Sequence, residues 1–178
     1  MALTSKNIET LIVLCRKGNQ LAQLEVYNRY QHAMYNTSLR IIKDSAEAED
    51  IMQESFLSAF TKLDSFSGNV TFGAWLKRIV INNSLTALKN SNKLNTIPLE
   101  KTDVSCVQEE KQDYSMLKAS DILNKVAQLK NNYKVAITLN LIEGYDYEEI
   151  AQIMDITYEN SRTTVSRAKS KLRQLLSQ

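Results

Sequence analysis

The chain has 178 residues, of which 43% are hydrophobic and 24% are charged, so it can form one ordinary domain or two small ones. Glycine and proline number only four and one; because strand-rich proteins need many turns, this scarcity predicts an all-α chain. No window approaches the roughly 20 apolar residues of a membrane span, and the first residues lack a secretory leader, so a cytoplasmic protein is expected.

Residues that could support catalysis or metal binding are few and scattered. Cys15 and Cys106 are far apart with no paired spacing, and His32 is the only histidine. Zinc sites and nucleophile–base pairs require such residues at defined spacings. The sequence therefore predicts that the protein is not an enzyme and holds no metal and no cofactor.

Two helices are predicted at the start of the chain. The first runs from about residue 6 to residue 17 and stops at Gly18, since glycine is best suited to a left-handed helix end. Asn19 can cap a long second helix that continues to about residue 43. Its apolar side is expected to comprise Leu21, Leu24, Tyr27, Tyr30, Met34, Leu39 and Ile42.

A third helix is predicted from a capping box of Asp44 and Glu47 to about residue 63. One side of it, away from its apolar face, carries an acidic and amide stripe. The stripe consists of Asp50, Gln53, Glu54 and Leu57. An acidic surface cannot be a phosphate contact, so if it is functional it meets a basic protein; a merely solvated face is the simpler alternative.

A fourth helix follows a loop at residues 64–70 that contains Phe66. Its polar side presents Arg78, Asn82, Thr86 and Lys89. Cations and an amide beside an aromatic side chain that is expected to be exposed suit a single nucleic-acid strand whose bases are splayed out. Trp75 lies in register with the apolar residues, which favours core packing over base stacking.

The apolar pattern then breaks, and polar residues surround the only proline, Pro98. Such a stretch predicts a flexible linker. We therefore expect an N-terminal domain at residues 1–89, a linker at 90–115 and a C-terminal domain at 116–178.

The C-terminal domain is predicted to resume near residue 120, to continue through residues 133–143 and to end in a helix-turn-helix. Asp146 and Glu149 form a capping box before a short helix, and Thr157 is the start signal of the last one. From Thr157 onward five basic residues accompany one acidic residue, a net of +4 against +2 for the whole chain. A cationic helix behind a tight turn is typical of a recognition helix in a DNA major groove, although a solvated basic face is the alternative.

Two blocks of this sequence resemble a known family. Residues 48–60, 63–66 and 72–79 resemble the conserved second region of bacterial extracytoplasmic-function (ECF) sigma factors, within the sigma-70 family, and residues 144–173 resemble their fourth region. The resemblance covers almost the whole chain in order. It implies two small helical domains, a four-helix region 2-like domain and a helix-turn-helix region 4-like domain, joined by a flexible linker.

The resemblance also implies a function and a set of contacts. The protein would bind core RNA polymerase and direct it to promoter DNA, with an anti-sigma factor as a further partner. The core-polymerase contacts would be Asp50, Gln53, Glu54 and Leu57. The promoter −10 element would be contacted by Phe66, Asn69, Trp75, Lys77, Arg78 and Asn82. The −35 element would be contacted by Arg162, Thr163, Ser166, Arg167, Lys169 and Lys171.

Three positions depart from the family pattern. Lys130 stands where a proline commonly follows Leu129, Asp155 where the turn often has glycine, and Thr164 where the recognition helix often has arginine. The first two would change turn geometry modestly, whereas the third bears on the individual base contacts.

Two other classes of protein fit parts of the sequence. One is a two-domain regulator that binds duplex DNA without joining polymerase, and the other is a helical adaptor whose basic helix meets an acidic protein. The regulator does not need an acidic stripe on the third helix together with a strand-binding face on the fourth. That combination favours the sigma factor.

Overall fold

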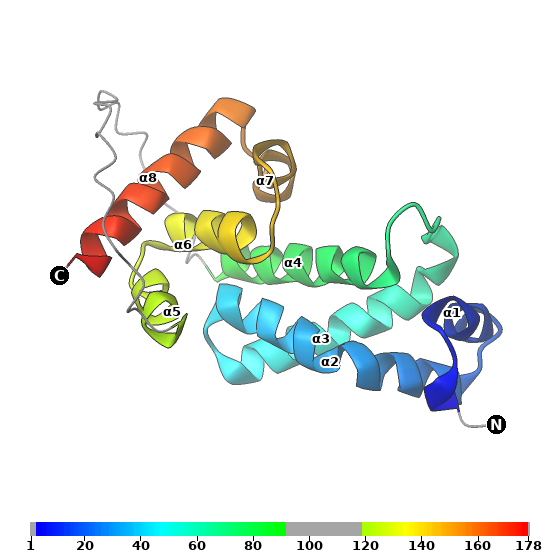
Figure 1. Ribbon diagram of the computed structural model, residues 1–178. Helices are drawn as coiled ribbons and strands as arrows, with labels where there is room; N and C mark the ends of the chain where they lie inside the picture. Colours follow the sequence, from blue (N-terminus) through cyan, green and yellow to red (C-terminus); the bar gives the residue numbers. More distant parts are fainter. Residues whose placement is uncertain (1–2, 92–118, 178) are drawn as a thin grey trace. The chain divides into compact units, whose positions relative to one another are not determined.

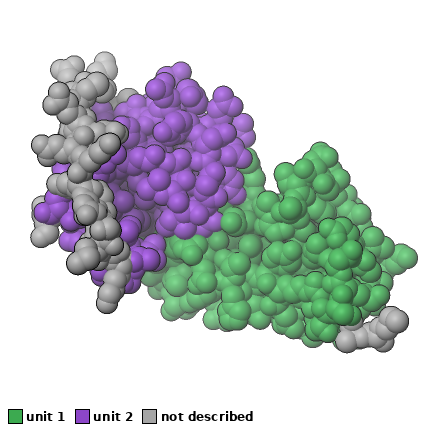
Figure 2. Space-filling model, in the orientation of Figure 1, with its two compact units in different colours: residues 1–90 green, residues 91–178 purple. Residues whose placement is uncertain are grey.

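The computed structural model describes residues 3–91 and 119–177, and its ordered segments in this part of the chain are all helical (Figure 1). The chain divides into two compact units, unit 1 at residues 1–90 and unit 2 at residues 91–178 (Figure 2). The predicted all-α fold with two small helical domains is confirmed. The predicted linker falls, from residue 92 on, outside the described residues.

The described residues of unit 1 form four α-helices. They are α1 (Ile8–Arg16), α2 (Gln20–Ile42), α3 (Ser45–Thr61) and α4 (Phe72–Asn90), with short 3-10 helices η1 (Leu3–Ser5) before α1 and η2 (Leu63–Ser65) before α4. Helices α2, α3 and α4 pack against one another, and α1 packs against α2 and η2. This arrangement places the loop between α3 and α4 beside the end of α1.

The predicted helix boundaries in unit 1 follow from local chemistry. The side chain of Asn19 accepts the amide of Ala22 at 2.9 Å, and that of Asp44 accepts the amide of Glu47 at 2.9 Å. These bonds satisfy amides that have no partner inside the helix. Gly18 has a φ of +75°, as predicted for the residue that ends α1.

The predicted apolar side of α2 is partly wrong. Leu21 and Leu24 are exposed, with 68% and 55% of their surface accessible. The buried row in this part of α2 instead runs through Ala22 and Val26. Ala22 lies one position after Leu21, about 100° around the helix axis, and Val26 lies two positions after Leu24. Small residues at the helix contact let α2 approach its neighbours, and a pattern read from large apolar residues overlooks them.

Polar groups are buried between α2, α3 and α4, and they are paired. The amide of Asn83 donates to Ser55 Oγ at 2.9 Å, and Ser55 Oγ donates to the carbonyl of Ile51 at 2.6 Å. The hydroxyl oxygens of Ser84 and Ser38 lie 3.1 Å apart. Small hydroxyl residues thus fill the close helix contacts without leaving polar atoms unsatisfied.

In its described residues, unit 2 contains a helix-turn-helix preceded by two further helices. Its elements are α5 (Ala119–Ala127), α6 (Asn131–Ile137), the π-helical turn η3 (Thr138–Ile142), α7 (Tyr147–Met154) and α8 (Tyr158–Leu176). Helix α8 packs against α5, α6 and α7. The core includes Val126, Leu129, Ile137, Ala168 and Leu172.

The segment at residues 131–142 does not remain α-helical throughout. It changes to a π-helical turn at Thr138, where the amide of Glu143 donates to the carbonyl of Thr138 at 3.0 Å. A π-turn adds one residue to the helical repeat and so rotates the side chains that follow it. The apolar periodicity of the sequence does not predict this change from an α-helix to a π-helical turn.

The start signals of the helix-turn-helix are confirmed. The side chain of Asp146 accepts the amide of Glu149 at 2.8 Å, while the side chain of Glu149 accepts the amide of Asp146 at 3.0 Å. The hydroxyl of Thr157 accepts the amide of Asn160 at 3.2 Å. Within the described residues, none of these helices is long and apolar enough to cross a membrane.

Candidate protein and nucleic-acid interfaces

The acidic and amide stripe of α3 lies on the surface. Asp50, Gln53, Glu54 and Leu57 are all exposed, whereas Ile51, Met52, Ser55 and Phe56 of the same helix are buried. Leu57 has 68% of its surface accessible. The stripe thus exposes carboxylate and amide groups together with one apolar side chain, and carboxylates repel a phosphate backbone.

The loop between α3 and α4 rests on an aromatic cluster. The ring of Phe66 lies 5.7 Å from that of Phe72 and 5.3 Å from that of Trp75, measured between ring centroids. Phe66 is therefore half-buried, and its interpretation as an exposed aromatic is wrong because its ring packs on α4. Trp75 is also half-buried in this cluster, in agreement with the core packing expected for it.

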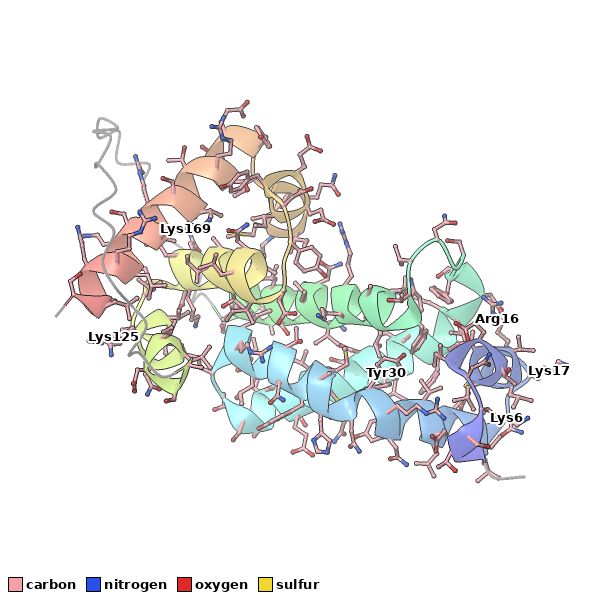
Figure 3. The ribbon with its side chains drawn as sticks, viewed as in Figure 1. Lys6, Arg16, Lys17, Tyr30, Lys125 and Lys169 are labelled. Atoms are coloured by element: carbon pink, nitrogen blue, oxygen red, sulfur yellow. The ribbon has the colours of Figure 1, made fainter. Side chains whose placement is uncertain are left out.

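The start of this loop is held by α1. The Arg16 Nη2 atom donates to the carbonyl of Phe66 at 2.7 Å and to the carbonyl of Leu63 at 3.3 Å. Figure 3 labels Arg16 on α1. Sequence analysis missed this contact, because a basic residue in the last turn of a helix is equally consistent with an interaction with the helix dipole.

The end of the loop is held by the first turn of α4. The hydroxyl of Thr71 accepts the amide of Ala74 at 3.3 Å, and the carbonyl of Thr71 accepts the amide of Trp75 at 3.1 Å. Between these two fixed ends, residues 67–71 are exposed. Gly68 adopts a φ of +80°, a left-handed conformation that glycine accepts without strain. The exposed residues of the loop are thus held between two fixed ends.

The remaining residues assigned to the −10 element lie on the loop and along α4. Asn69 and Asn82 are exposed, and Lys77 and Arg78 are half-buried. Trp75, Arg78 and Asn82 follow one another at spacings of three and four, so they share a face of the helix. The structure therefore brings Phe66 to Trp75, while Asn82 lies about two turns, roughly 10 Å, further along the helix.

The cysteine of unit 1 lies in the core. Cys15 is buried in the core, and desolvation raises the pKa of its thiol. A thiol with a raised pKa is a poor nucleophile at neutral pH. Among the described residues there is also no group of three His, Cys, Asp or Glu side chains placed to hold a metal ion.

The basic face of α8 points away from the core of unit 2. Val165, Ala168 and Leu172 are buried, whereas the residues assigned to the −35 element are exposed (Arg162, Ser166, Lys171) or half-buried (Thr163, Arg167, Lys169; Lys169 is labelled in Figure 3). The Arg162 guanidinium lies over the ring of Tyr158, 5.8 Å from its centroid. This cation–π contact restrains the side chain near the start of the helix.

The turn that precedes α8 is tight and depends on one unusual residue. Asp155 adopts a left-handed conformation with a φ of 58°, and the amides of Asp155 and Ile156 both donate to the carbonyl of Ala151. Glycine would adopt this conformation more readily, but aspartate tolerates it better than most residues. Aspartate at this position, where the family often has glycine, is therefore compatible with the tight turn.

The chain has clear relatives. A family model described as sigma-70 region 2 matches residues 26–93, and a model described as sigma-70 region 4 matches residues 120–172. The ECF RNA polymerase sigma-E factor of Salmonella typhimurium is 31% identical over 90% of both chains. The RNA polymerase sigma-H factor of Pseudomonas aeruginosa is 28% identical over 94% of this chain and 92% of its own.

A solved structure has the same fold. The sigma factor RpoE of Bartonella quintana, in a co-crystal with the anti-sigma factor NepR, superposes with a TM-score of 0.59 at 22% identity, over 86% of this chain and 95% of that one.

Proposed function

Because this chain belongs to the ECF group of the sigma-70 family, we propose that its two units divide the recognition of one promoter between them. The protein is an RNA polymerase sigma factor, the subunit that directs polymerase to promoters and starts transcription there. This membership decides against the stand-alone regulator and the helical adaptor. The observation that supports this division is that the two units carry different surfaces. Unit 1 has the acidic and amide stripe of α3 and the polar side of α4, whereas unit 2 has the basic face of α8.

Unit 1 binds core polymerase through α3. The proposal is supported by the exposed stripe of Asp50, Gln53, Glu54 and Leu57. The carboxylates would steer the helix toward a basic surface of polymerase, and the leucine would supply apolar area at the centre of the contact. The opposite side of α3 packs in the core, so the stripe is presented on a rigid element.

Unit 1 also reads the −10 element. The exposed part of the loop would accept an unpaired base, and the polar side of α4 would bind the strand that leads to it. The residues we assign to this contact are Phe66, Asn69, Trp75, Lys77, Arg78 and Asn82. Phe66 and Trp75 would act from beneath the loop, since both are half-buried. Opening a promoter needs binding energy for flipped bases and no catalytic side chain from this subunit.

Unit 2 reads the −35 element with α8. Arg162, Thr163, Ser166 and Arg167 lie on the first half of the helix, the part that contacts base edges in helix-turn-helix proteins. Lys169 and Lys171 lie further along and would contact phosphates. The net charge of +4 from Thr157 onward supports a phosphate-binding surface.

An inhibitory partner and a cytoplasmic location complete the proposal. The Bartonella quintana protein was solved with an anti-sigma factor, and we propose a partner of the same class here, one that covers the polymerase-binding or DNA-binding surfaces. The cytoplasm is the compartment in which bacterial polymerase and promoters meet.

Run-off transcription tests the division of labour. Full-length protein is combined with purified core polymerase and promoter fragments from the source organism, and the same fragments are retested with the −10 or the −35 sequence scrambled. Transcripts should require the protein and fall on scrambling either element. Tight promoter binding by the protein alone, with no effect on transcription by core polymerase, would contradict the proposal.

A further inference from the structure

We propose that Arg16, in the last turn of α1, is a positioning residue for promoter opening, because it fixes the backbone from which the base-reading loop begins. The inference rests on the proposed role of the α3–α4 loop in reading the −10 element. It assigns a part in that reading to α1, a helix that carries none of the residues proposed to contact polymerase or DNA.

The guanidinium of Arg16 joins segments that are distant in sequence. Its Nη2 atom donates to the carbonyls of Leu63 and Phe66, which are 47 and 50 residues away. The nearby Asp64 carboxylate lies 4.0 Å from Arg16 Nε and is 95% exposed, so this ion pair contributes little. The two carbonyl contacts therefore form the connection.

These two carbonyls lie where the chain passes from the core to the exposed loop. Leu63 is buried in the core, whereas the residues after Phe66 are exposed. The ring of Phe66 is braced by Phe72 and Trp75 from α4, and its carbonyl is braced by Arg16 from α1. The direction in which the loop leaves the core is thus set from two sides.

Removing the Arg16 guanidinium would remove the contact from α1 and leave only the aromatic contacts from α4. The turn at residues 63–66 could then rotate about the Phe66 anchor, and the loop would have to be reordered whenever a base enters. A binding site that must be ordered on binding loses affinity relative to a preformed one. We expect base capture, and hence promoter opening, to weaken while the contact of α3 with polymerase is unaffected.

The chain supplies a matched control in Arg29. Its Nη2 atom donates to the carbonyls of Leu3 and Thr4 at 3.3 and 2.9 Å, and its Nε pairs with Glu25 at 2.7 Å. It therefore ties a helix to a neighbouring segment by the same chemistry as Arg16. Its segment, η1, lies at the start of the chain and does not lead into the loop.

The experiment compares Arg16→Ala, Arg29→Ala and Asn69→Ala in the full-length protein with core polymerase. The promoter is one that gives run-off transcripts, and opening is followed by 2-aminopurine fluorescence at the −10 element. Opening by Arg16→Ala should be about tenfold slower than wild type, the scale of a lost hydrogen bond to a charged group. Arg29→Ala should stay within about twofold.

A second readout separates positioning from ordinary stability. The ratio of opening rates on the native −10 element and on one with a single substituted base should fall in Arg16→Ala and stay at the wild-type value in Arg29→Ala. Should Arg16→Ala fail to fold by circular dichroism, Arg16→Gln, which keeps one donor group, takes its place. Equal opening rates and unchanged base ratios in both arginine variants would overturn the proposal.

Asn69→Ala distinguishes this failure from failure of the proposed function. If Asn69→Ala slows opening and the Arg16 variants do not, the loop reads the promoter and only the positioning role is wrong. If Asn69→Ala, Arg16→Ala and Arg16→Gln all behave as wild type, the loop is not the reader, and both proposals fall.

Discussion

The ring of Tyr30 in α2 lies so close to Gly73 in α4 that a methyl group on Gly73 would stand 2.9 Å from Tyr30 Cε1. The same ring makes an edge contact with Phe72, with 5.5 Å between centroids. Burial raises the pKa of the Tyr30 phenol. Gly73 thus permits a close contact at the start of the helix assigned to the −10 element.

We expect Gly73→Ala to destabilise unit 1 even though alanine favours helices. Replacing a helical glycine by alanine ordinarily stabilises by about 1 kcal/mol, but overpacking against a ring costs about 1–3 kcal/mol. The net loss should be about 1 kcal/mol in urea unfolding. In a Tyr30→Ala background the clash is absent, and Gly73→Ala should become stabilising. Additive effects of the two substitutions would contradict the contact.

Asp155→Gly should stabilise unit 2 by about 0.5–1 kcal/mol, because the native φ of 58° is left-handed and glycine adopts it without a Cβ penalty. Asp155→Ala should destabilise. Lys43, with a φ of 67°, is a matched site in unit 1, and Lys43→Gly should stabilise that unit to a similar degree. Thermal unfolding of the variants measures both effects, and a loss of stability in Asp155→Gly would show that the carboxylate matters more than the backbone.

Replacement by alanine should change the free energy of unfolding in opposite directions at two buried serines, Ser161 and Ser84. The Ser161 hydroxyl is buried and has no hydrogen-bond partner among the described residues, so Ser161→Ala should raise the free energy of unfolding by about 1 kcal/mol. Ser84 is equally buried, but its hydroxyl donates to the carbonyl of Val80 at 2.8 Å. Ser84→Ala should therefore be neutral or destabilising. The same sign for both variants in urea unfolding would contradict this reading.

Local chemistry was predictable from the sequence, and distant contacts were not. Asn19, Asp146 and Thr157 were predicted as helix caps because a cap needs only residues within a few positions of it. Arg16 and Tyr30 act on residues more than 40 positions away. No periodic pattern in their own helices encodes those partners, so only the packing of the helices reveals them.

The candidate site divides in the same way. The exposure of Asp50 and Glu54 followed from helical spacing, because their neighbours Ile51 and Met52 had to face the core. The half-buried state of Phe66 did not follow, since it depends on how the loop folds back onto α4. The exposed side of an amphipathic helix can therefore be predicted from the sequence, whereas the burial of a residue in the loop between two helices cannot.

Asp50→Lys with Glu54→Lys should weaken binding to core polymerase by at least tenfold while leaving helix content unchanged, because both side chains are exposed. The expected loss arises from repulsion at a basic partner surface. The single variant Glu9→Lys, at an exposed acid on α1, controls for general charge change when compared with Glu54→Lys. Unchanged affinity of the double variant in a pull-down with core polymerase would remove α3 from the interface.

The basic residues of α8 should fall into two classes when each is replaced by alanine. Arg162→Ala removes a residue near the start of the helix and should cost about 1–3 kcal/mol on the native −35 duplex, while relaxing preference at one base pair. Lys171→Ala should weaken all sequences alike and lower the slope of log affinity against log salt by about one.

Tyr158 refines the test of Arg162. Because the Arg162 guanidinium lies 5.8 Å from the centre of the Tyr158 ring, Tyr158→Phe should keep the orientation of the arginine and Tyr158→Ala should release it. Binding of each variant, within polymerase holoenzyme, to duplexes carrying every single substitution in the −35 element measures both affinity and preference. The assignment requires Tyr158→Ala to lose part of the base preference that Arg162→Ala loses, and Tyr158→Phe to retain it. If Arg162→Ala instead weakens every sequence equally, Arg162 contacts phosphate, and the base-reading role must lie elsewhere on α8.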